Sequence, residues 1–174
     1  MSKKELAKEI FDVAHITGEF KLRSGVVSNE YFDKYQFESR PLILKKISDA
    51  LIEIMPKDYD VLAPLEMGGI PIATAVALET GDVLSFVRKD AKEYGTCKLA
   101  EGVDIKGKKL LIVEDVVTSG GQIIISAKEL RDRGAIVKQA ICVIDREAGG
   151  REKLKEAGIE LTPLFTMTDL KNVK

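Results

Sequence analysis

The amino-acid sequence predicts an α/β protein with a mostly parallel sheet flanked by helices. The first observation is a set of aliphatic runs without polar alternation, at residues 60–64, 82–87, 109–114 and 135–145. The second is that helical patterns separate these runs along the chain. Strands that are apolar on both faces require helices on both sides of a parallel sheet. The third is the length of 174 residues, which suits a single domain, 1–174, with one core.

Two amphipathic helices are expected in the N-terminal part of the chain, the second after Pro41. Apolar residues recur at helical spacing on one face of each: Leu6, Ile10 and Val13 in the first, and Leu44, Ile47, Leu51 and Ile54 in the second. His15, the only histidine, lies near the end of the first helix. It is expected to be a packed or surface residue without a catalytic role.

The remaining elements are predicted from turn-forming residues and from the spacing of apolar residues. Between the two helices, Phe20–Arg23 and Glu30–Tyr35 alternate around a Gly and Ser-Asn, which predicts a small hairpin or flap outside the central sheet. Further helices are expected over 70–79 and over 121–134, the latter ending on Gly134 as a left-handed cap. The last unit, 151–170, supplies another helix and an edge strand.

Composition and charge exclude several classes of function. The formal net charge of −1 gives no field that would attract nucleic acid, so an anion must be bound by a local cluster. Cys97 and Cys142 are far apart in sequence, which argues against a disulfide framework and for a reducing compartment. No apolar run approaches transmembrane length and no signal peptide is evident. We therefore expect a cytoplasmic protein with small-molecule ligands.

The candidate site lies where the predicted strands end, because open parallel sheets bind ligands at the carboxyl ends of their strands. One strand is expected over Leu110–Val113 and a helix over Gln122–Arg133, leaving Glu114–Gly121 as a loop. Glycines let backbone N–H groups converge on an anion, Thr118 and Ser119 add hydroxyl donors, and the helix N-terminus adds positive potential. The loop therefore predicts a phosphate site.

The adjacent acids Glu114 and Asp115 need a different partner, such as the hydroxyls of a sugar or a magnesium ion. A phosphorylated sugar would satisfy both halves of the stretch. The loop lacks the Lys of a Walker A motif and the glycine spacing of a dinucleotide site. The structural alternative is that the acids cap the strand end and Gly120–Gly121 open a tight turn. The order of acids, hydroxyls and glycines favours the functional interpretation.

The stretch "LLIVEDVVTSGGQ" resembles the phosphoribosyl-pyrophosphate (PRPP) motif of the type I phosphoribosyltransferases, to which it is highly specific. The resemblance implies that family's fold, a Rossmann-like sheet with a small N-terminal hood, here about 18–40, on a core of about 41–174. It also implies that Glu114 and Asp115 hold the ribose hydroxyls. The residues that would surround the 5′-phosphate are Val116, Val117, Thr118, Ser119, Gly120, Gly121 and Gln122.

Two further stretches resemble the orotate phosphoribosyltransferases. In "GEFKLRSGVVSNEYFDKY", which resembles their hood, Arg23 would approach the pyrophosphate or base site, and Tyr31 and Phe32 would pack against the pyrimidine. In "CVIDREAGG", Arg146 would recognise the base, and an Arg there can grip a carboxylate with two hydrogen bonds. Thr118 completes the implied orotate set. Alternatives for these stretches alone are a plain hairpin and a surface Arg paired with Glu147.

The polar connection at 88–107 resembles the catalytic loop of the same enzymes. The resemblance implies that Arg88, Lys89 and Lys92 neutralise pyrophosphate, and that the 88–102 loop reaches the neighbouring subunit's site in a homodimer. Tyr94 stands where the family usually has His. Because Tyr is a poor acid–base group near neutral pH, Lys92 is the better candidate for assisting the departing pyrophosphate, with Asp115 as the second catalytic residue. The alternative is a solvated charged hairpin.

The resemblance implies that orotate displaces pyrophosphate from PRPP, giving orotidine 5′-monophosphate in pyrimidine synthesis. The only implied cofactor is Mg²⁺, carried by PRPP without direct protein ligands. Two alternatives remain open: a phosphoribosyltransferase for another nucleobase, and a non-catalytic PRPP-sensing regulator. The absence of excess positive charge argues against the regulator.

Overall fold

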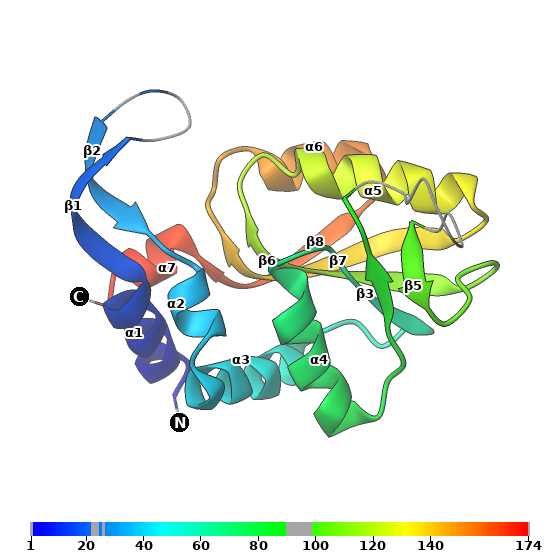
Figure 1. Cartoon of the computed structure of the whole chain (residues 1–174), viewed down its shortest axis with the longest axis horizontal. Coiled ribbons are helices and arrows are strands. Elements are labelled where there is room, and N and C mark those ends of the chain that lie inside the picture. The colour runs from blue at the N-terminus through cyan, green and yellow to red at the C-terminus, as the bar shows by residue number, and fades with distance from the viewer. Residues whose placement is uncertain (1, 22–24, 26, 90–98, 174) are drawn as a thin grey trace.

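The computed structural model describes residues 2–21, 25, 27–89 and 99–173, and its centre is a parallel sheet (Figure 1). Four strands lie in the order β3-β6-β7-β8, with every neighbouring pair parallel. Their bounds are Val61–Pro64 (β3), Lys109–Val117 (β6), Ile136–Asp145 (β7) and Glu160–Thr166 (β8). The predicted mostly parallel sheet is therefore confirmed.

Beside β3 the sheet continues into a short two-stranded extension. Strand β4 (Ser85–Val87) runs next to β3 through parallel bridges that join Leu62 to Leu84 and Leu65 to Val87. Strand β5 (Ala100–Gly102) pairs with β4 in the antiparallel sense. The predicted polar connection after β4 thus returns to the core, since Leu99 and Ile105 are buried.

Helices cover both faces of the sheet, as the aliphatic strands require (Figure 1). On one face lie α1 (Lys3–Ala14), α3 (Pro41–Ile54) and α4 (Gly69–Thr80), which share one buried cluster with β6 and β7. On the other lie α5 (Gly121–Asp132) and α6 (Gly150–Glu156), which share a second cluster with the same strands. Gly134 follows α5 with φ +89°, as predicted for a left-handed cap.

An antiparallel hairpin projects from this core at the N-terminal side (Figure 1). Its strands are β1 (His15–Lys21) and β2 (Val27–Phe32), and the short helix α2 (Tyr35–Glu38) follows. The hairpin was predicted, but β1 begins at His15 rather than Phe20, and Tyr35 belongs to α2. A last helix, α7 (Met167–Lys171), contacts α1 and β8.

Two expectations about individual elements were wrong. Strand β6 does not end at Val113 but continues through Glu114 to Val117, paired with β7 along this length. On α3, Ile54 is exposed, whereas Ile43 faces the core. Among the described residues, no helix combines the length and the apolar character that a membrane crossing needs.

Candidate functional site

The carboxyl ends of the central strands form one edge, and backbone hydrogen bonds hold the segments that follow them together. The Arg146 N–H after β7 donates to the Val117 carbonyl at 2.9 Å. The Leu65 N–H after β3 donates to the Val113 carbonyl at 3.1 Å, and the Glu66 N–H donates to the Val87 carbonyl at 2.9 Å. The stretches predicted to carry chemistry therefore meet at this edge.

The first part of the site is a hollow of about 180 Å³ at the end of β6. Its lining comes almost entirely from the predicted phosphate stretch: Glu114, Val116, Val117, Thr118, Ser119, Gly120, Gly121, Gln122 and Ile123. The turn requires Gly120 because its φ is +72°, in the left-handed region. Since α5 begins at Gly121, its unpaired N–H groups and positive dipole end lie at this hollow. These features suit a phosphate group.

The loop around this hollow packs closely against the start of α6. A Cβ on Gly150 would lie 2.6 Å from the Thr118 carbonyl oxygen, so only glycine fits there. A Cβ on Gly120 would lie 3.0 Å from Leu154 of α6. Gly150 of the pair Gly149–Gly150 therefore supports the shape of the loop at Gly120–Gly121.

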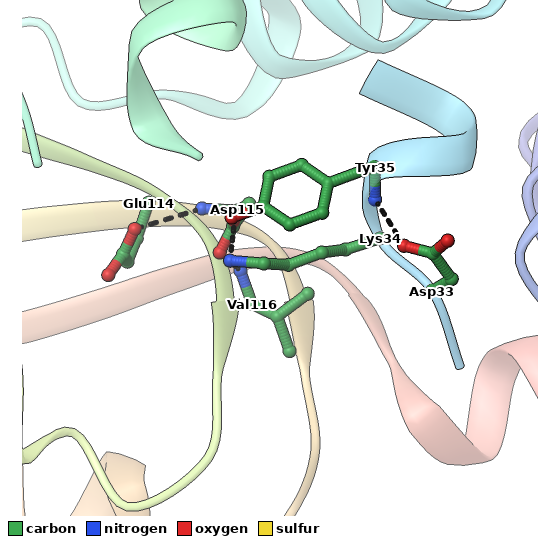
Figure 2. Close-up of polar contacts among 6 residues, drawn as sticks. All are labelled: Asp33, Lys34, Tyr35, Glu114, Asp115 and Val116. Carbon is green, nitrogen blue, oxygen red and sulfur yellow. Dashed lines mark hydrogen bonds and ion pairs between the residues drawn. The ribbon is translucent and has the colours of Figure 1, made fainter. Parts of the chain in front are cut away.

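The two adjacent acids have different surroundings. Glu114 lines the hollow, whereas Asp115 is buried with 1% of its surface exposed and does not line it. The Asp115 carboxylate accepts hydrogen bonds from the Lys34 ammonium and from the Val116 N–H (Figure 2). The Asp115 N–H in turn donates to Glu114 Oε2 at 3.3 Å. Both oxygens of Asp115 are thus engaged by protein groups.

The loop after β3 covers Asp115 from the side of α4. A Cβ on Gly68 would lie 1.5 Å from Asp115 Oδ2, and a Cβ on Gly69 would lie 2.2 Å from the Val113 carbonyl oxygen. Both glycines are therefore required by close approach. The same loop contacts the segment after β4, because the Lys89 N–H donates to Glu66 Oε1 at 2.8 Å.

A second buried carboxyl group, Glu38 of α2, lies against Asp115. Burial, followed by the charge of Asp115 and a hydrogen bond to it, raises the pKa of Glu38 to about 8. Burial, followed by the charge of Asp115, likewise raises the pKa of Glu114 to about 8. Burial acts to lower the pKa of Lys34, but the hydrogen bond and charge of Asp115 outweigh it and raise that pKa. The neighbouring carboxyl groups therefore oppose one another's ionisation, and Lys34 is the cation beside them.

A hollow of about 390 Å³ lies between the hairpin, α1, α7 and the end of β7. Tyr31, Phe32 and Arg146, three of the residues predicted to bind orotate, line it together with His15 and Lys171. The expected packing of His15 is confirmed, because its ring stacks on Phe11 at 4.7 Å between centroids.

A third hollow, of about 740 Å³, lies near the amino ends of β7 and β8, among residues such as Lys138 and Glu160.

Other predicted site residues divide into described and undescribed ones. Arg88 approaches Glu101, with 3.7 Å between Nε and Oε1. The Glu147 carboxylate accepts from both the backbone N–H and the hydroxyl of Thr168, at 2.8 and 2.6 Å, and so has its own partner. Arg23, Lys92 and Tyr94 lie outside the described residues, so their roles stay predictions.

Sequence reasoning missed Lys34 and Glu38. They lie in "DKYQFE", a short stretch in which polar and aromatic residues alternate after Asp33. Nothing in that pattern distinguishes a buried charge pair from a solvated turn. The one available signal was indirect, since a buried carboxylate at the end of β6 requires a cation or N–H donors from elsewhere in the chain.

Comparisons with known proteins agree with this geometry. Residues 35–162 match the Phosphoribosyl transferase domain family. An orotate phosphoribosyltransferase of Nocardioides sp. is 45% identical over 165 residues, covering 95% of this chain and 92% of that protein. That of Pyrococcus abyssi is 44% identical over 172 residues, covering 97% and 94%. A crystal structure of the Mycobacterium tuberculosis orotate phosphoribosyltransferase has a TM-score of 0.87 and 28% identity, covering 97% and 98%.

Proposed function

Because the chain belongs to the phosphoribosyltransferase family and, within it, to the orotate phosphoribosyltransferases, we infer that it transfers the 5-phosphoribosyl group of PRPP to orotate. The products are orotidine 5′-monophosphate and pyrophosphate, and the reaction belongs to pyrimidine synthesis. The observation that carries this conclusion is that the predicted phosphate residues and three predicted orotate residues line two hollows at the same edge of the sheet.

We propose that the smaller hollow binds the ribose phosphate. The phosphate would lie at Thr118–Gly121, where backbone N–H groups, hydroxyls and the N-terminus of α5 favour an anion. Glu114 lines the same hollow and would accept hydrogen bonds from the ribose hydroxyls. Asp115 is engaged by Lys34 and Val116, so it would reach the sugar only by sharing or exchanging one of these contacts.

We propose that orotate binds in the hollow of about 390 Å³ beside the hairpin. Tyr31 and Phe32 offer aromatic faces to a planar pyrimidine, and Arg146 offers a guanidinium to its carboxylate. Because the Glu147 carboxylate is engaged by Thr168, it leaves the guanidinium available for a ligand. Thr118, at the other hollow, would lie between base and phosphate. Arg23 remains part of this proposal although it lies outside the described residues.

Charge complementarity accounts for the catalysis. As the bond to pyrophosphate breaks, positive charge develops on the ribosyl ring and negative charge on the leaving group. Glu114 and Asp115 suit the first, and Arg88, Lys89 and Lys92 suit the second, so preorganised charge stabilises the transition state. No covalent nucleophile is required, because orotate itself attacks the anomeric carbon.

We propose that magnesium arrives bound to PRPP. Within the described part of the chain, no group of three or more His, Cys, Asp or Glu side chains comes together as a metal site. The ion's own charge would neutralise the pyrophosphate oxygens when PRPP is bound. Residues of this chain then need only bind the sugar and base and add cations to the leaving group.

We further propose a cytoplasmic homodimer in which the 88–102 loop of one subunit contributes to the site of its partner. Mixing an Asp115→Ala protein with a Lys92→Ala protein tests this arrangement. Heterodimers should regain activity, because one of their two sites then combines an intact Asp115 with an intact Lys92. Complete inactivity of the mixed dimers would rule out sharing of the loop.

The inferred reaction is tested by steady-state release of pyrophosphate from PRPP with orotate, uracil, adenine, hypoxanthine and xanthine assayed in parallel. Orotate should be the preferred acceptor, because the hollow beside the hairpin offers Arg146 to a carboxylate that the other bases lack. Turnover with a purine and none with orotate would replace the inference with another base specificity. Binding of PRPP without turnover of any base would instead favour a PRPP-sensing regulator.

A further inference from the structure

Lys34 and Glu38 have no contact of their own with sugar, phosphate or base in the proposed function. Both lie close to Glu114 and Asp115, the two carboxylates assigned to the sugar. Lys34 comes from the segment between the hairpin and α2, and its ammonium donates to Asp115 of β6 (Figure 2). Glu38 is 7% exposed, and burial together with the nearby charge of Asp115 raises its pKa. Two buried carboxyl groups, Glu38 and Asp115, therefore lie beside a partly exposed ammonium and next to Glu114 at the hollow.

The backbone around Lys34 is fixed from both sides. The Asp33 N–H donates to the Ala14 carbonyl at the end of α1, at 2.8 Å. The Asp33 carboxylate accepts from the Tyr35 N–H at 3.1 Å (Figure 2). It also accepts from the Gln36 side-chain amide at 3.0 Å, and the two bonds hold the start of α2. The Lys34 side chain thus extends from a rigid support, with its ammonium 5.1 Å from the centre of the Tyr35 ring.

Without Lys34, the arrangement of acids would be electrostatically unfavourable. The charge of Asp115 acts to raise the pKa of both Glu38 and Glu114, and among the charged groups around them Lys34 is the one that acts to lower it. The raised pKa of Glu38 favours its neutral carboxyl form beside Asp115. Glu114 is then the carboxyl group that must lose its proton to accept hydrogen bonds from two sugar hydroxyls.

We propose that Lys34 is a positioning residue for the sugar site: by anchoring the Asp115 carboxylate it fixes Glu114 toward the ribose hydroxyls and makes PRPP binding depend on the hood. The proposal rests on the proposed function, because it assigns the ribose to Glu114. It gives the hairpin a second role besides holding the base. Its backbone leads through Phe32 and Asp33 directly into Lys34.

The test measures PRPP affinity in the presence of magnesium by calorimetry, from pH 6.5 to 9. Lys34→Met keeps the length of the side chain but removes its charge. It should weaken PRPP binding about tenfold at pH 7 and shift the pH of half-maximal affinity upward by about one unit, since one pKa unit corresponds to a tenfold change. Lys34→Arg should restore most of the affinity. Lys8→Met, which removes an exposed ion pair with Asp12, is the matched control and should change nothing.

Removing Lys34 alone leaves the buried Asp115 carboxylate without its cation. A double variant in which both partners are neutral therefore provides a second comparison. If Lys34 acts through Asp115, the Lys34→Met/Asp115→Asn double variant should bind PRPP as Asp115→Asn does. An unchanged pH profile in Lys34→Met, or an equal loss in Lys34→Arg, would overturn the proposal. Because these measurements need no acceptor, they remain decisive even if orotate proves not to be the substrate.

Discussion

Replacing Glu38 with Gln should change how the stability of the protein depends on pH. The pKa of Glu38 is raised from 4.5 to about 8 in the folded state. Between these values the unfolded chain releases the proton and the folded chain keeps it, so stability falls as pH rises. Each pH unit in this window costs about 1.4 kcal/mol, or about 2–3 kcal/mol between pH 5.5 and 7.5. The amide of the Glu38→Gln variant cannot ionise and can still donate a hydrogen bond to Asp115.

The assay is thermal and urea unfolding of wild type and Glu38→Gln at pH 5.5 and 7.5. Both proteins should be similarly stable at pH 5.5. At pH 7.5 the variant should be the more stable by about 2–3 kcal/mol, or several degrees in Tm at about 2–4 °C per kcal/mol. Glu114 titrates in both proteins and cancels in the comparison. Glu53→Gln, on the exposed side of α3, is the control. Parallel pH curves for wild type and Glu38→Gln would refute the buried, protonated assignment.

Two further predictions concern the loops around the site. Gly68→Ala should lower stability by about 1–3 kcal/mol because its Cβ would lie 1.5 Å from Asp115 Oδ2. Gly121→Ala, whose Cβ would meet only Ser119 Oγ at 3.6 Å, should melt close to wild type, and equal melting of the two variants would contradict the close approach. Lys92→Ala should lower kcat far more than it weakens PRPP binding, as judged by steady-state kinetics and calorimetry. Unchanged turnover would remove Lys92 from catalysis.

The parallel sheet and its helices could be predicted because their signal is local and repeated. Aliphatic runs such as Leu110–Val113 admit few alternatives to a buried strand, and the phosphate stretch after them has a characteristic order of residue types. The end of β6 could not be predicted in the same way. Two adjacent acids suggest a loop, yet β7 continues the ladder to Val117 and pairs with it.

The partners of the buried acids were not predictable, because they come from distant parts of the sequence. Lys34 lies 81 residues from Asp115 and belongs to a segment with no apolar periodicity. The return of Leu99 and Ile105 to the core has the same cause, since isolated apolar residues in a polar stretch carry no periodic signal. Long-range pairing, rather than local pattern, decides these features.

The most direct test of the central claim is the product balance with PRPP and orotate. Orotidine 5′-monophosphate and pyrophosphate should appear in equal amounts, only when both substrates and magnesium are present. Arg146→Gln should raise the KM for orotate while PRPP affinity, measured by calorimetry, stays near that of wild type. Pyrophosphate release that does not depend on orotate, or an orotate KM unaffected in Arg146→Gln, would contradict the site described for this chain.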